Sequence, residues 1–292
     1  MMRDKLVIFS RYGVEGASSR YRFFNYRCAL NCHFDVRFFN FFHQSYVSRQ
    51  FLRKPVLKFR VLLDYFSRLR ALISNYNVPV IWVEKELFPL LPFWIESLLV
   101  SRKTRVIIDF DDAWFLRYDD QNSVLKVFNV AQKFEMWARR GAVFSCGNKW
   151  LADYFLSVGG KAVILPTCVS DRVPRIRKVI SSKFPDGSFE KPPVIIGWIG
   201  SPSTQCFLDR LELVSGMLVR QFNVRFMFVG IESSGIPGAM HVSWSERLEY
   251  FLIDYFDIGV MPLDSTEWSQ GKCGLKIIQC LSRGVPVVAT AT

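Results

Sequence analysis

The chain has 292 residues, of which half are apolar and 15% aromatic, and it carries a formal net charge of +12. That length suits one large or two medium domains with a sizeable core. The sequence has no stretch of eighteen apolar residues, no signal-peptide pattern and no Cys-x-x-Cys pair, so we expect no membrane-spanning segment, no cleaved leader and no zinc site. Its seven cysteines, an odd number, are typical of reduced cytosolic thiols.

The first half of the chain alternates apolar strands with helical patterns. We predict strands at residues 5–9, 34–39, 78–83, 105–109, 142–145 and 162–165. We predict helices at 124–140, at 149–157 and from Arg20 onward, the last capped by Ser18 or Ser19. This alternation is typical of a parallel α/β sheet, in which ligands bind at the carboxyl ends of the strands.

The excess of positive over negative charge lies entirely in the first part of the chain. Residues 1–190 carry 30 Lys and Arg against 17 Asp and Glu, a net charge of +13, whereas residues 191–292 carry 8 against 9, a net charge of −1. This asymmetry indicates an anionic partner, either nucleic acid or an anionic membrane surface, unless it only serves solubility. No nucleic-acid-binding module is recognisable, so we expect no nucleic acid.

A basic amphipathic helix is predicted after Pro55. Residues 20–70 contain 11 Lys and Arg against 2 acids. Six apolar side chains recur at helical spacing: Phe59, Leu62, Leu63, Phe66, Leu69 and Ile73. The basic residues expected to contact a membrane are Arg53, Lys54, Lys58 and Arg60. Helices of this kind bind anionic membrane surfaces. The alternative is a domain helix whose apolar stripe packs on the core.

The second half follows a linker at residues 171–193, which has a basic cluster and then Ser, Pro and Gly. The α/β pattern then restarts, with strands at 194–198, 225–229 and 258–261 and helices at 208–219 and 245–255. We therefore predict two domains, residues 1–186 and 187–292.

The chain closes with a loop, a helix, a turn and a strand. Gly274 precedes the helical run at 275–281, and Gly284 separates it from the strand at 285–288. A helix N-terminus behind a glycine-containing loop binds anions, because its N–H groups and its dipole point at the ligand. Lys272 and Lys276 add positive charge there. The alternative is an ordinary αβ unit without a ligand.

Several segments together resemble the retaining GT-B glycosyltransferases of the large family-four, or group 1, type. Residues 271–290 are similar to their sugar-nucleotide segment, and further similar segments lie at 18–22, 108–113, 146–151, 166–167, 196–204 and 256–263. The resemblance implies an α/β protein of the GT-B class, with two Rossmann-like domains facing a cleft. The second domain would be incomplete, because relatives continue beyond the position of Thr292.

The resemblance also implies a nucleotide diphosphate sugar as donor. Its expected contacts are Gly200, Ser201, Lys272, Gly274, Leu275, Lys276 and Gln279. Gln279 and Gly271 stand where relatives carry glutamates, and Glu267 or Asp264 could substitute for the acid that is missing at position 271. GT-B enzymes usually need no metal, so we expect no metal and no other cofactor.

Asp111 and Asp112 are the predicted catalytic residues, because they follow the strand at 105–109 and could orient the donor sugar or an acceptor hydroxyl. The alternatives are helix-capping or turn carboxylates and, together with Asp109, a metal site. Gly13, Ser19 and Arg20 are expected in a loop on the acceptor side. If the acceptor attacks from the front face, the leaving phosphate takes the proton and no side chain need act as nucleophile.

The function that these patterns predict is transfer of a sugar, with retention, to a glycan or lipid-linked acceptor in bacterial surface polysaccharide biosynthesis. The protein would be cytoplasmic and peripheral on the inner face of the membrane. The alternative is a truncated, non-catalytic GT-B protein that binds a glycan or a partner enzyme.

Overall fold

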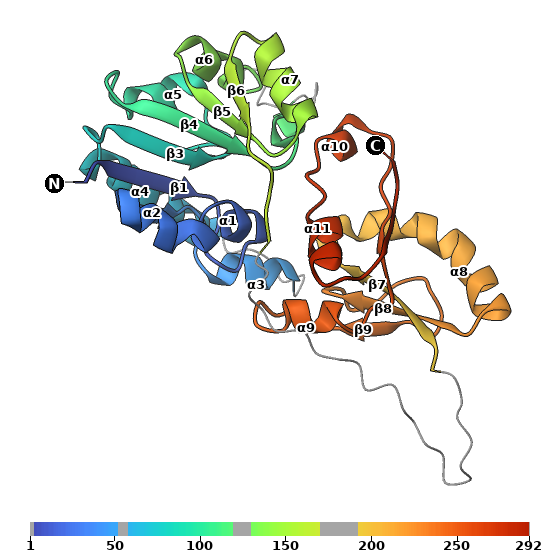
Figure 1. Cartoon of the computed structure of the whole chain (residues 1–292). Coiled ribbons are helices and arrows are strands. Elements are labelled where there is room, and N and C mark those ends of the chain that lie inside the picture. Colours follow the sequence, from blue (N-terminus) through green and yellow to red (C-terminus); the bar gives the residue numbers. More distant parts are fainter. Residues whose placement is uncertain (1–2, 52–57, 119–129, 170–191, 292) are drawn as a thin grey trace. The chain divides into compact units, whose positions relative to one another are not determined.

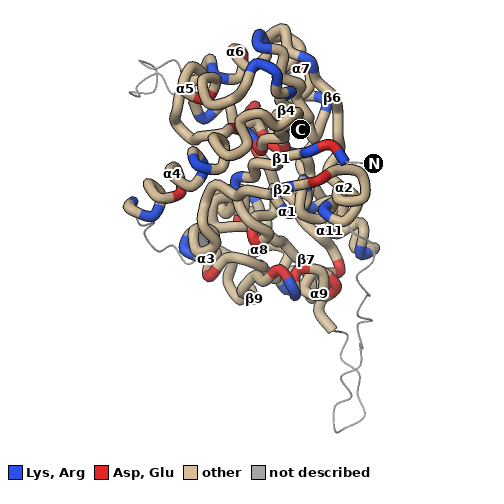
Figure 2. The backbone as a smooth tube through the Cα atoms, turned by 90° about the vertical axis from the view of Figure 1, so that its left-hand side faces the viewer, with Lys and Arg blue, Asp and Glu red and all other residues tan. Residues whose placement is uncertain are grey.

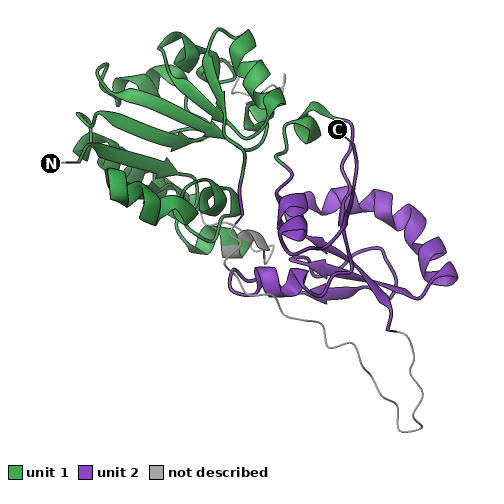
Figure 3. Ribbon diagram, in the orientation of Figure 1, with its two compact units in different colours: residues 1–167, 266–273 green, residues 168–265, 274–292 purple. Residues whose placement is uncertain are grey.

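The computed structural model describes residues 3–51, 58–118, 130–169 and 192–291 (Figure 1). The chain divides into two compact units (Figure 3). Unit 1 comprises residues 1–167 and 266–273, and unit 2 comprises residues 168–265 and 274–292. We call residues 266–273 the crossing segment, because unit 2 both precedes and follows it in the sequence. The predicted boundary between residues 186 and 187 lies outside the described residues.

Unit 1 is built on a parallel sheet with the strand order β2-β1-β3-β4-β5-β6 among its described residues. The strands are β1 (Lys5–Ser10), β2 (Asp35–Asn40), β3 (Val80–Glu84), β4 (Arg105–Phe110), β5 (Val143–Cys146) and β6 (Lys161–Ile164). All six predicted strands are confirmed, with ends shifted by one or two residues. The strand order reverses between β1 and β3, and ligands of doubly wound sheets bind at such a switch point.

The helices of unit 1 cover this sheet and bury an aromatic core. They are α1 (Ala17–Arg22), η1 (Phe24–Tyr26), α2 (Arg27–His33), α3 (Ser45–Phe51), α4 (Lys58–Ser74), α5 (Phe93–Leu98), η2 (Trp114–Tyr118), α6 (Lys133–Arg139), α7 (Lys149–Ser157) and, in the crossing segment, α10 (Glu267–Gln270). Phe110, Phe144 and Phe155 pack together at its centre. The predicted serine cap is wrong: α1 begins after Gly16, without a side-chain cap. Of the helix predicted at 124–140, residues 124–129 lie outside the described part.

Helix α4 does not bury the apolar stripe that the sequence contains. Phe59, Leu62, Leu63, Phe66 and Ile73 are each at least half exposed, and Leu69 alone of the six packs on the core.

The buried face of α4 carries Asp64 and Arg68 instead, together with Ala71 and Leu72. The Arg68 Nη2 donates to the Ser10 carbonyl at 2.6 Å. The alternative in which the stripe packs on the core is therefore wrong for this helix.

Basic residues occur at several positions along α4 (Figure 2). Lys58 and Arg60 are exposed there, whereas Arg53 and Lys54 lie outside the described residues. Among the residues that the structure describes, no helix is both long enough and apolar enough to cross a bilayer.

Unit 2 has a second parallel sheet with the strand order β11-β10-β7-β8-β9. Its strands are β7 (Val194–Ile199), β8 (Val224–Val229), β9 (Met240–Val242), β10 (Ile258–Met261) and β11 (Val287–Ala289), and its helices are η4 (Pro202–Leu208), α8 (Asp209–Gln221), α9 (Glu249–Ile253) and α11 (Leu275–Ser282). The order reverses between β7 and β10, which makes the loops after these strands the switch point of this sheet. Strand β9 has only three residues and was not predicted.

Candidate functional site

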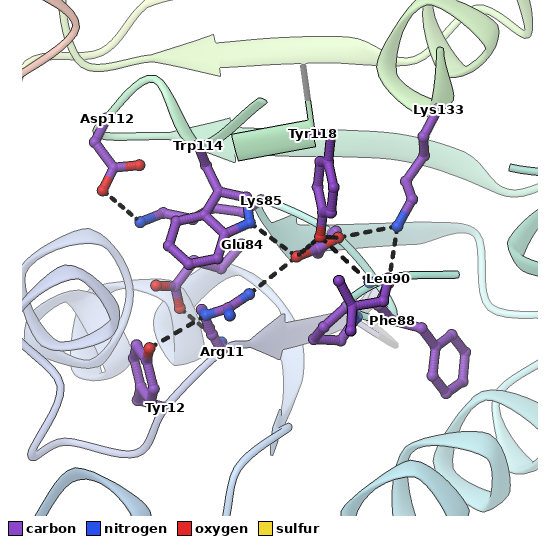
Figure 4. Close-up of polar contacts among 12 residues, drawn as sticks. Arg11, Tyr12, Glu84, Lys85, Phe88, Leu90, Asp112, Trp114, Tyr118 and Lys133 are labelled. Atoms are coloured by element: carbon purple, nitrogen blue, oxygen red, sulfur yellow. Dashed lines mark hydrogen bonds and ion pairs between the residues drawn. The ribbon is translucent and has the colours of Figure 1, made fainter. Parts of the chain in front are cut away.

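The switch point of unit 1 holds three consecutive charged residues, Glu84, Lys85 and Glu86. Lys85 has a φ of 63°, a left-handed conformation that is uncommon for a residue with a side chain. Its N–H donates to the Asp109 carbonyl at 2.9 Å, and the Glu86 N–H donates to the Glu84 carbonyl at 2.7 Å. This reversal of the backbone directs the three neighbouring side chains to different partners, and Figure 4 shows the contacts of Glu84 with Arg11 and of Lys85 with Asp112.

Glu84 is buried between β1 and α1. Its Oε2 accepts the Arg11 backbone N–H at 2.7 Å and the Ser19 hydroxyl at 2.6 Å. Its Oε1 accepts no hydrogen bond from the part of the chain that the structure describes. Burial raises the pKa of Glu84 to about 7; the charge of Asp111 adds to this, whereas Lys85, Ser19 and the Arg11 N–H oppose it. The contact with Glu84 also explains why Ser19 does not cap α1.

Lys85 bridges the two predicted catalytic residues. Its Nζ lies 3.1 Å from the Asp111 Oδ1 and 2.9 Å from the Asp112 Oδ2. Burial raises the pKa of Asp111, but Lys85, the Ser18 hydroxyl and Arg22 together outweigh burial and hold that pKa below its ordinary value. Burial lowers the pKa of Lys85, but the surrounding carboxylates outweigh it and raise that pKa. Asp111 and Lys85 are therefore both charged near neutral pH.

The Asp109 carboxylate pairs with Arg22 rather than with Lys85. Its carboxylate receives two hydrogen bonds from the Arg22 guanidinium, at 2.8 Å and 2.7 Å, and both side chains are buried. Arg22 also donates to the Leu165 carbonyl at 2.5 Å, so the pair ties α1 to β4 and to the end of β6. In the described ranges no group of three His, Cys, Asp or Glu is arranged to hold a metal ion.

Glu86 lies at the centre of a buried network beside this site. It accepts from the Arg11 Nη1 at 3.0 Å, from the Trp114 Nε1 at 2.9 Å and from the Tyr118 hydroxyl at 2.7 Å. The Lys133 Nζ lies 2.9 Å from Glu86 and 3.1 Å from Glu96. Because every partner is inside unit 1, this network fixes the loop after β3.

The crossing segment packs beside the aspartates. The Asn148 Nδ2 donates to the carbonyls of Gln270 and Lys272, both at 3.1 Å. The Lys272 Nζ lies 5.3 Å from the centroid of the Trp268 ring, and Arg117 lies 4.9 Å from the same ring.

Lys272, predicted as a donor contact, therefore belongs to unit 1, whereas the other residues predicted to contact the donor belong to unit 2. Burial lowers its pKa, and the charges of Asp112, Lys85, Asp111 and Arg117 act on it.

In unit 2 the structure brings Gly200 and Lys276 together at the switch point. The Lys276 Nζ lies 4.9 Å from the centroid of the Trp198 ring. A Cβ at position 200 would lie 2.4 Å from Trp198 and 3.0 Å from the Lys276 Cε, so only glycine fits. Ser201 follows, with its hydroxyl 2.8 Å from that of Ser203. Gly274, with a φ of 64°, is the N-cap of α11, and Leu275 is its first residue.

Gln279 is buried inside unit 2. Its Nε2 donates to the Glu249 Oε1, and the Glu249 Oε2 accepts the Trp244 Nε1 at 3.0 Å. The amide predicted to hold a ribose is thus engaged by a carboxylate that the sequence analysis did not consider.

Of the three residues predicted for a loop on the acceptor side, Gly13 lies in a loop of unit 1, whereas Ser19 and Arg20 lie inside helix α1. Ser19 contacts Glu84 at the switch point. The Arg20 Nη1 donates to the Val14 carbonyl at 2.9 Å, and the Gly13 N–H donates to the Glu15 Oε1 at 3.2 Å. A role of these residues in acceptor binding stays a prediction.

Sequence reasoning missed Glu84, Lys85, Trp114 and Arg117. The first two had a signal, because a Glu-Lys-Glu run directly after an apolar strand places charge at the carboxyl end of that strand. Trp114 and Arg117 had none, because their importance depends on the crossing segment.

Comparison with known proteins identifies the fold. No protein-family model matches the sequence, and the comparison with curated proteins gives no match. Among solved structures, sucrose-phosphate synthase from Thermosynechococcus elongatus is similar with a TM-score of 0.64 at 11% identity, over 99% of this chain and 82% of that chain. HepE from Anabaena, in complex with UDP and glucose, gives a TM-score of 0.61 at 10% identity, over 98% and 80%.

An α-glucosyltransferase in complex with UDP and a 13-mer DNA gives a TM-score of 0.58 at 13% identity, over 98% of this chain and 80% of that chain. At these identities the similarity shows the fold alone. The chain therefore has the GT-B fold, and the predicted fold class is confirmed.

Proposed function

We propose that the chain is a glycosyltransferase whose donor is a nucleotide diphosphate sugar. The observation that carries the proposal is that each parallel sheet has polar groups suited to one half of this reaction at its switch point. In unit 2, Gly200, Lys276 and the N-terminus of α11 offer backbone N–H groups and a cation to a diphosphate. In unit 1, Asp111 and Asp112 offer acceptors to hydroxyl groups. The UDP in two similar structures supports a uridine nucleotide as the first to test.

The finer parts of the proposal rest on the sequence segments at 108–113 and 271–290. These finer parts are transfer with retention, membership of the family-four type, and independence of metal and other cofactors. The last of them is the acceptor, which would be a glycan or a lipid-linked saccharide in bacterial surface polysaccharide biosynthesis. In such a reaction the leaving diphosphate develops charge, which Lys276 and backbone N–H groups would stabilise.

A donor screen tests the proposal. UDP-sugars and GDP-sugars are first ranked by thermal shift, and release of nucleoside diphosphate is then measured with and without saccharide acceptors. Proton NMR of the product identifies the anomer and so tests retention. The control is the double variant Asp111→Asn/Asp112→Asn, which should still bind the donor but turn over at least tenfold more slowly, about 1.4 kcal/mol in the barrier. Donor binding without turnover by the wild type would favour the alternative of a non-catalytic binding protein.

We also propose that unit 1 associates with an anionic membrane surface on the cytosolic side through α4. The exposed side chains of Phe59, Leu62, Leu63 and Phe66 supply an apolar face, and Lys58 and Arg60 supply charge beside it. An amphipathic helix with this composition binds at the level of the lipid headgroups. Such an association would bring a lipid-linked acceptor to unit 1.

A further inference from the structure

We propose that Lys85 is the positioning residue of this transferase, fixing Asp111 and Asp112 as a pair that accepts hydrogen bonds from the hydroxyl groups of a sugar substrate. The inference rests on the proposed function and deepens it. It adds a residue that was not predicted from the sequence, and it gives the two aspartates a defined task.

The Lys85 ammonium and its two carboxylate partners differ in their exposure to solvent. The Lys85 side chain is 4% exposed, whereas those of Asp111 and Asp112 are 17% and 20% exposed. The lysine therefore lies beneath the pair, and a ligand that reaches the aspartates does not compete for its position. The Asp112 Oδ1 accepts no hydrogen bond among the described residues, although it is buried. The accessible part of each carboxylate can accept a charge-assisted hydrogen bond from a hydroxyl group of a ligand.

A second lysine in unit 1, Lys133, forms a similar bridge that is purely structural and differs from that of Lys85 in its exposure. Lys133 also bridges two carboxylates, but its partners Glu86 and Glu96 are 1% and 0% exposed. No ligand reaches them. Lys85 makes the same type of bridge at the carboxyl end of the sheet, with both partners accessible.

The backbone at Lys85 supports this role. A lysine gains nothing intrinsic from a left-handed conformation, which is unfavourable for any residue with a Cβ. Such residues persist where the surrounding structure holds them, and they occur preferentially at functional sites. Here the positive φ follows directly on β3 and directs the ammonium to Asp111 and Asp112, while Glu84 remains bonded to Ser19.

Several charged groups from other elements also act on the aspartates or on Lys85. They are Glu84 at the end of β3, Asp109 of β4, Arg22 of α1 and Lys272 of the crossing segment. The Cys273 thiol also faces the aspartates, but burial raises its pKa and it is neutral. After burial, the charge of Lys85 has the largest effect on Asp111, and it lowers the pKa. Without Lys85 the pKa of Asp111 must therefore rise.

The test compares Lys85→Met with Lys85→Arg. In Lys85→Met, kcat for transfer should fall at least tenfold at neutral pH, donor affinity should stay within twofold, and the acid limb of the pH–rate profile should move to higher pH. Lys85→Arg keeps the charge but alters the geometry, so its kcat should fall while its acid limb stays in place. Lys103→Met, an exposed lysine of unit 1, is the matched control and should change neither.

A Lys85→Met protein with the wild-type rate and acid limb would overturn the inference while leaving the proposed function intact. If the wild type transfers no sugar, the proposed function fails. Carboxyl-carbon NMR then decides the remaining claim, because an equal pKa of Asp111 in wild type and Lys85→Met would show that Lys85 does not hold it. If Lys85→Met does not fold, Lys85→Arg supplies both measurements: an unchanged kcat would contradict the positioning role, and a raised pKa of Asp111 would contradict the role of the charge.

Discussion

Gly271 packs directly on Ala113. A Cβ at position 271 would lie 2.5 Å from the Cβ of Ala113 and 2.9 Å from its backbone nitrogen. Because the nearest atoms belong to another backbone segment, they cannot move aside as a flexible side chain would. Position 271 therefore has no room for a glutamate side chain, nor for any other side chain, unless Ala113 moves.

The Gly271→Ala variant should lower the free energy of unfolding by about 1–3 kcal/mol, the usual effect of overpacking. Urea denaturation measures it. Gly216→Ala is the control, because Gly216 lies inside α8 and a Cβ there would be 3.5 Å or more from its neighbours. That substitution should stabilise the protein by up to about 1 kcal/mol, through helix propensity. Equal effects of the two substitutions would contradict the close packing at position 271.

Lys133→Met should destabilise the protein by about 3–5 kcal/mol, because it leaves two buried glutamates without their shared cation. The same helix provides a control. Arg139 forms an exposed pair with Glu135, and Arg139→Met should cost no more than about 0.5 kcal/mol. Thermal and urea unfolding of both variants measure the difference. A small loss for Lys133→Met would mean that Arg11 and Tyr118 suffice to stabilise Glu86.

Glu84 should make stability fall as pH rises through neutrality. Its pKa is about 7 in the folded chain against an ordinary value of 4.5, so the folded chain holds the proton more tightly. The stability contributed by protonated Glu84 is complete below about pH 4.5 and is lost as pH rises through about 7.

The Glu84→Gln variant removes this titration. It should therefore gain stability relative to wild type at pH 8, by up to about 3 kcal/mol at 1.36 kcal/mol per pKa unit, with no such gain at pH 4.5. Urea denaturation at both pH values tests this, with the partly exposed Glu135→Gln as control. A difference that does not change with pH would show that Glu84 is ionised throughout.

Lys276→Ala should weaken binding of a nucleotide diphosphate sugar by about 1–3 kcal/mol, the scale of a hydrogen bond to a charged group. The ammonium lies over Trp198 and beside Gly200, at the switch point of unit 2. Calorimetric titration with UDP measures the change. Arg247→Ala removes an exposed cation of the same unit and should leave the affinity unchanged. If the two variants bind equally well, the donor site lies elsewhere.

Membrane binding should depend on both the exposed apolar residues and the exposed basic residues of α4. The triple variant Phe59→Ser/Leu62→Ser/Phe66→Ser should no longer cosediment with anionic vesicles. Lys58→Gln/Arg60→Gln should weaken binding by about 1 kcal/mol per charge and reduce its dependence on salt. Leu213→Ser, on the exposed surface of α8, is the control. Equal sedimentation with neutral and anionic vesicles, or none with either, would contradict the proposal.

The strands were predictable, because most of them are apolar runs bounded by polar residues. That pattern located every strand of unit 1 and also β7, β8, β10 and β11. It missed β9, whose three residues are too few to show a period. Helix α4 shows the opposite limit. Its apolar spacing is clear in the sequence, but spacing does not tell which face of the helix packs on the sheet. Arg68 lies on the buried face because its guanidinium donates hydrogen bonds to two backbone carbonyls.

The candidate site was predictable only where function is carried by residues next to each other in the sequence. Asp111 and Asp112 follow a strand and could be named from the sequence, and their catalytic role stays a prediction. Lys85 becomes their partner only because β3 pairs with β4, and Glu84 meets Ser19 only because β1 pairs with β3. The packing of the crossing segment within unit 1 was beyond sequence reasoning, because it depends on Asn148, whose side chain donates to the Gln270 carbonyl 122 residues further along the chain.

The crossing segment limits how the two halves of this chain can be exchanged. A recombination event anywhere between residues 168 and 265 would replace not only unit 2 but also the eight residues that complete unit 1. A hybrid would then carry a foreign side chain against Ala113 and foreign carbonyls against Asn148. Positions 113 and 148 and residues 266–273 are therefore expected to change together among homologues. A successful chimera must have two additional junctions, one on each side of the crossing segment.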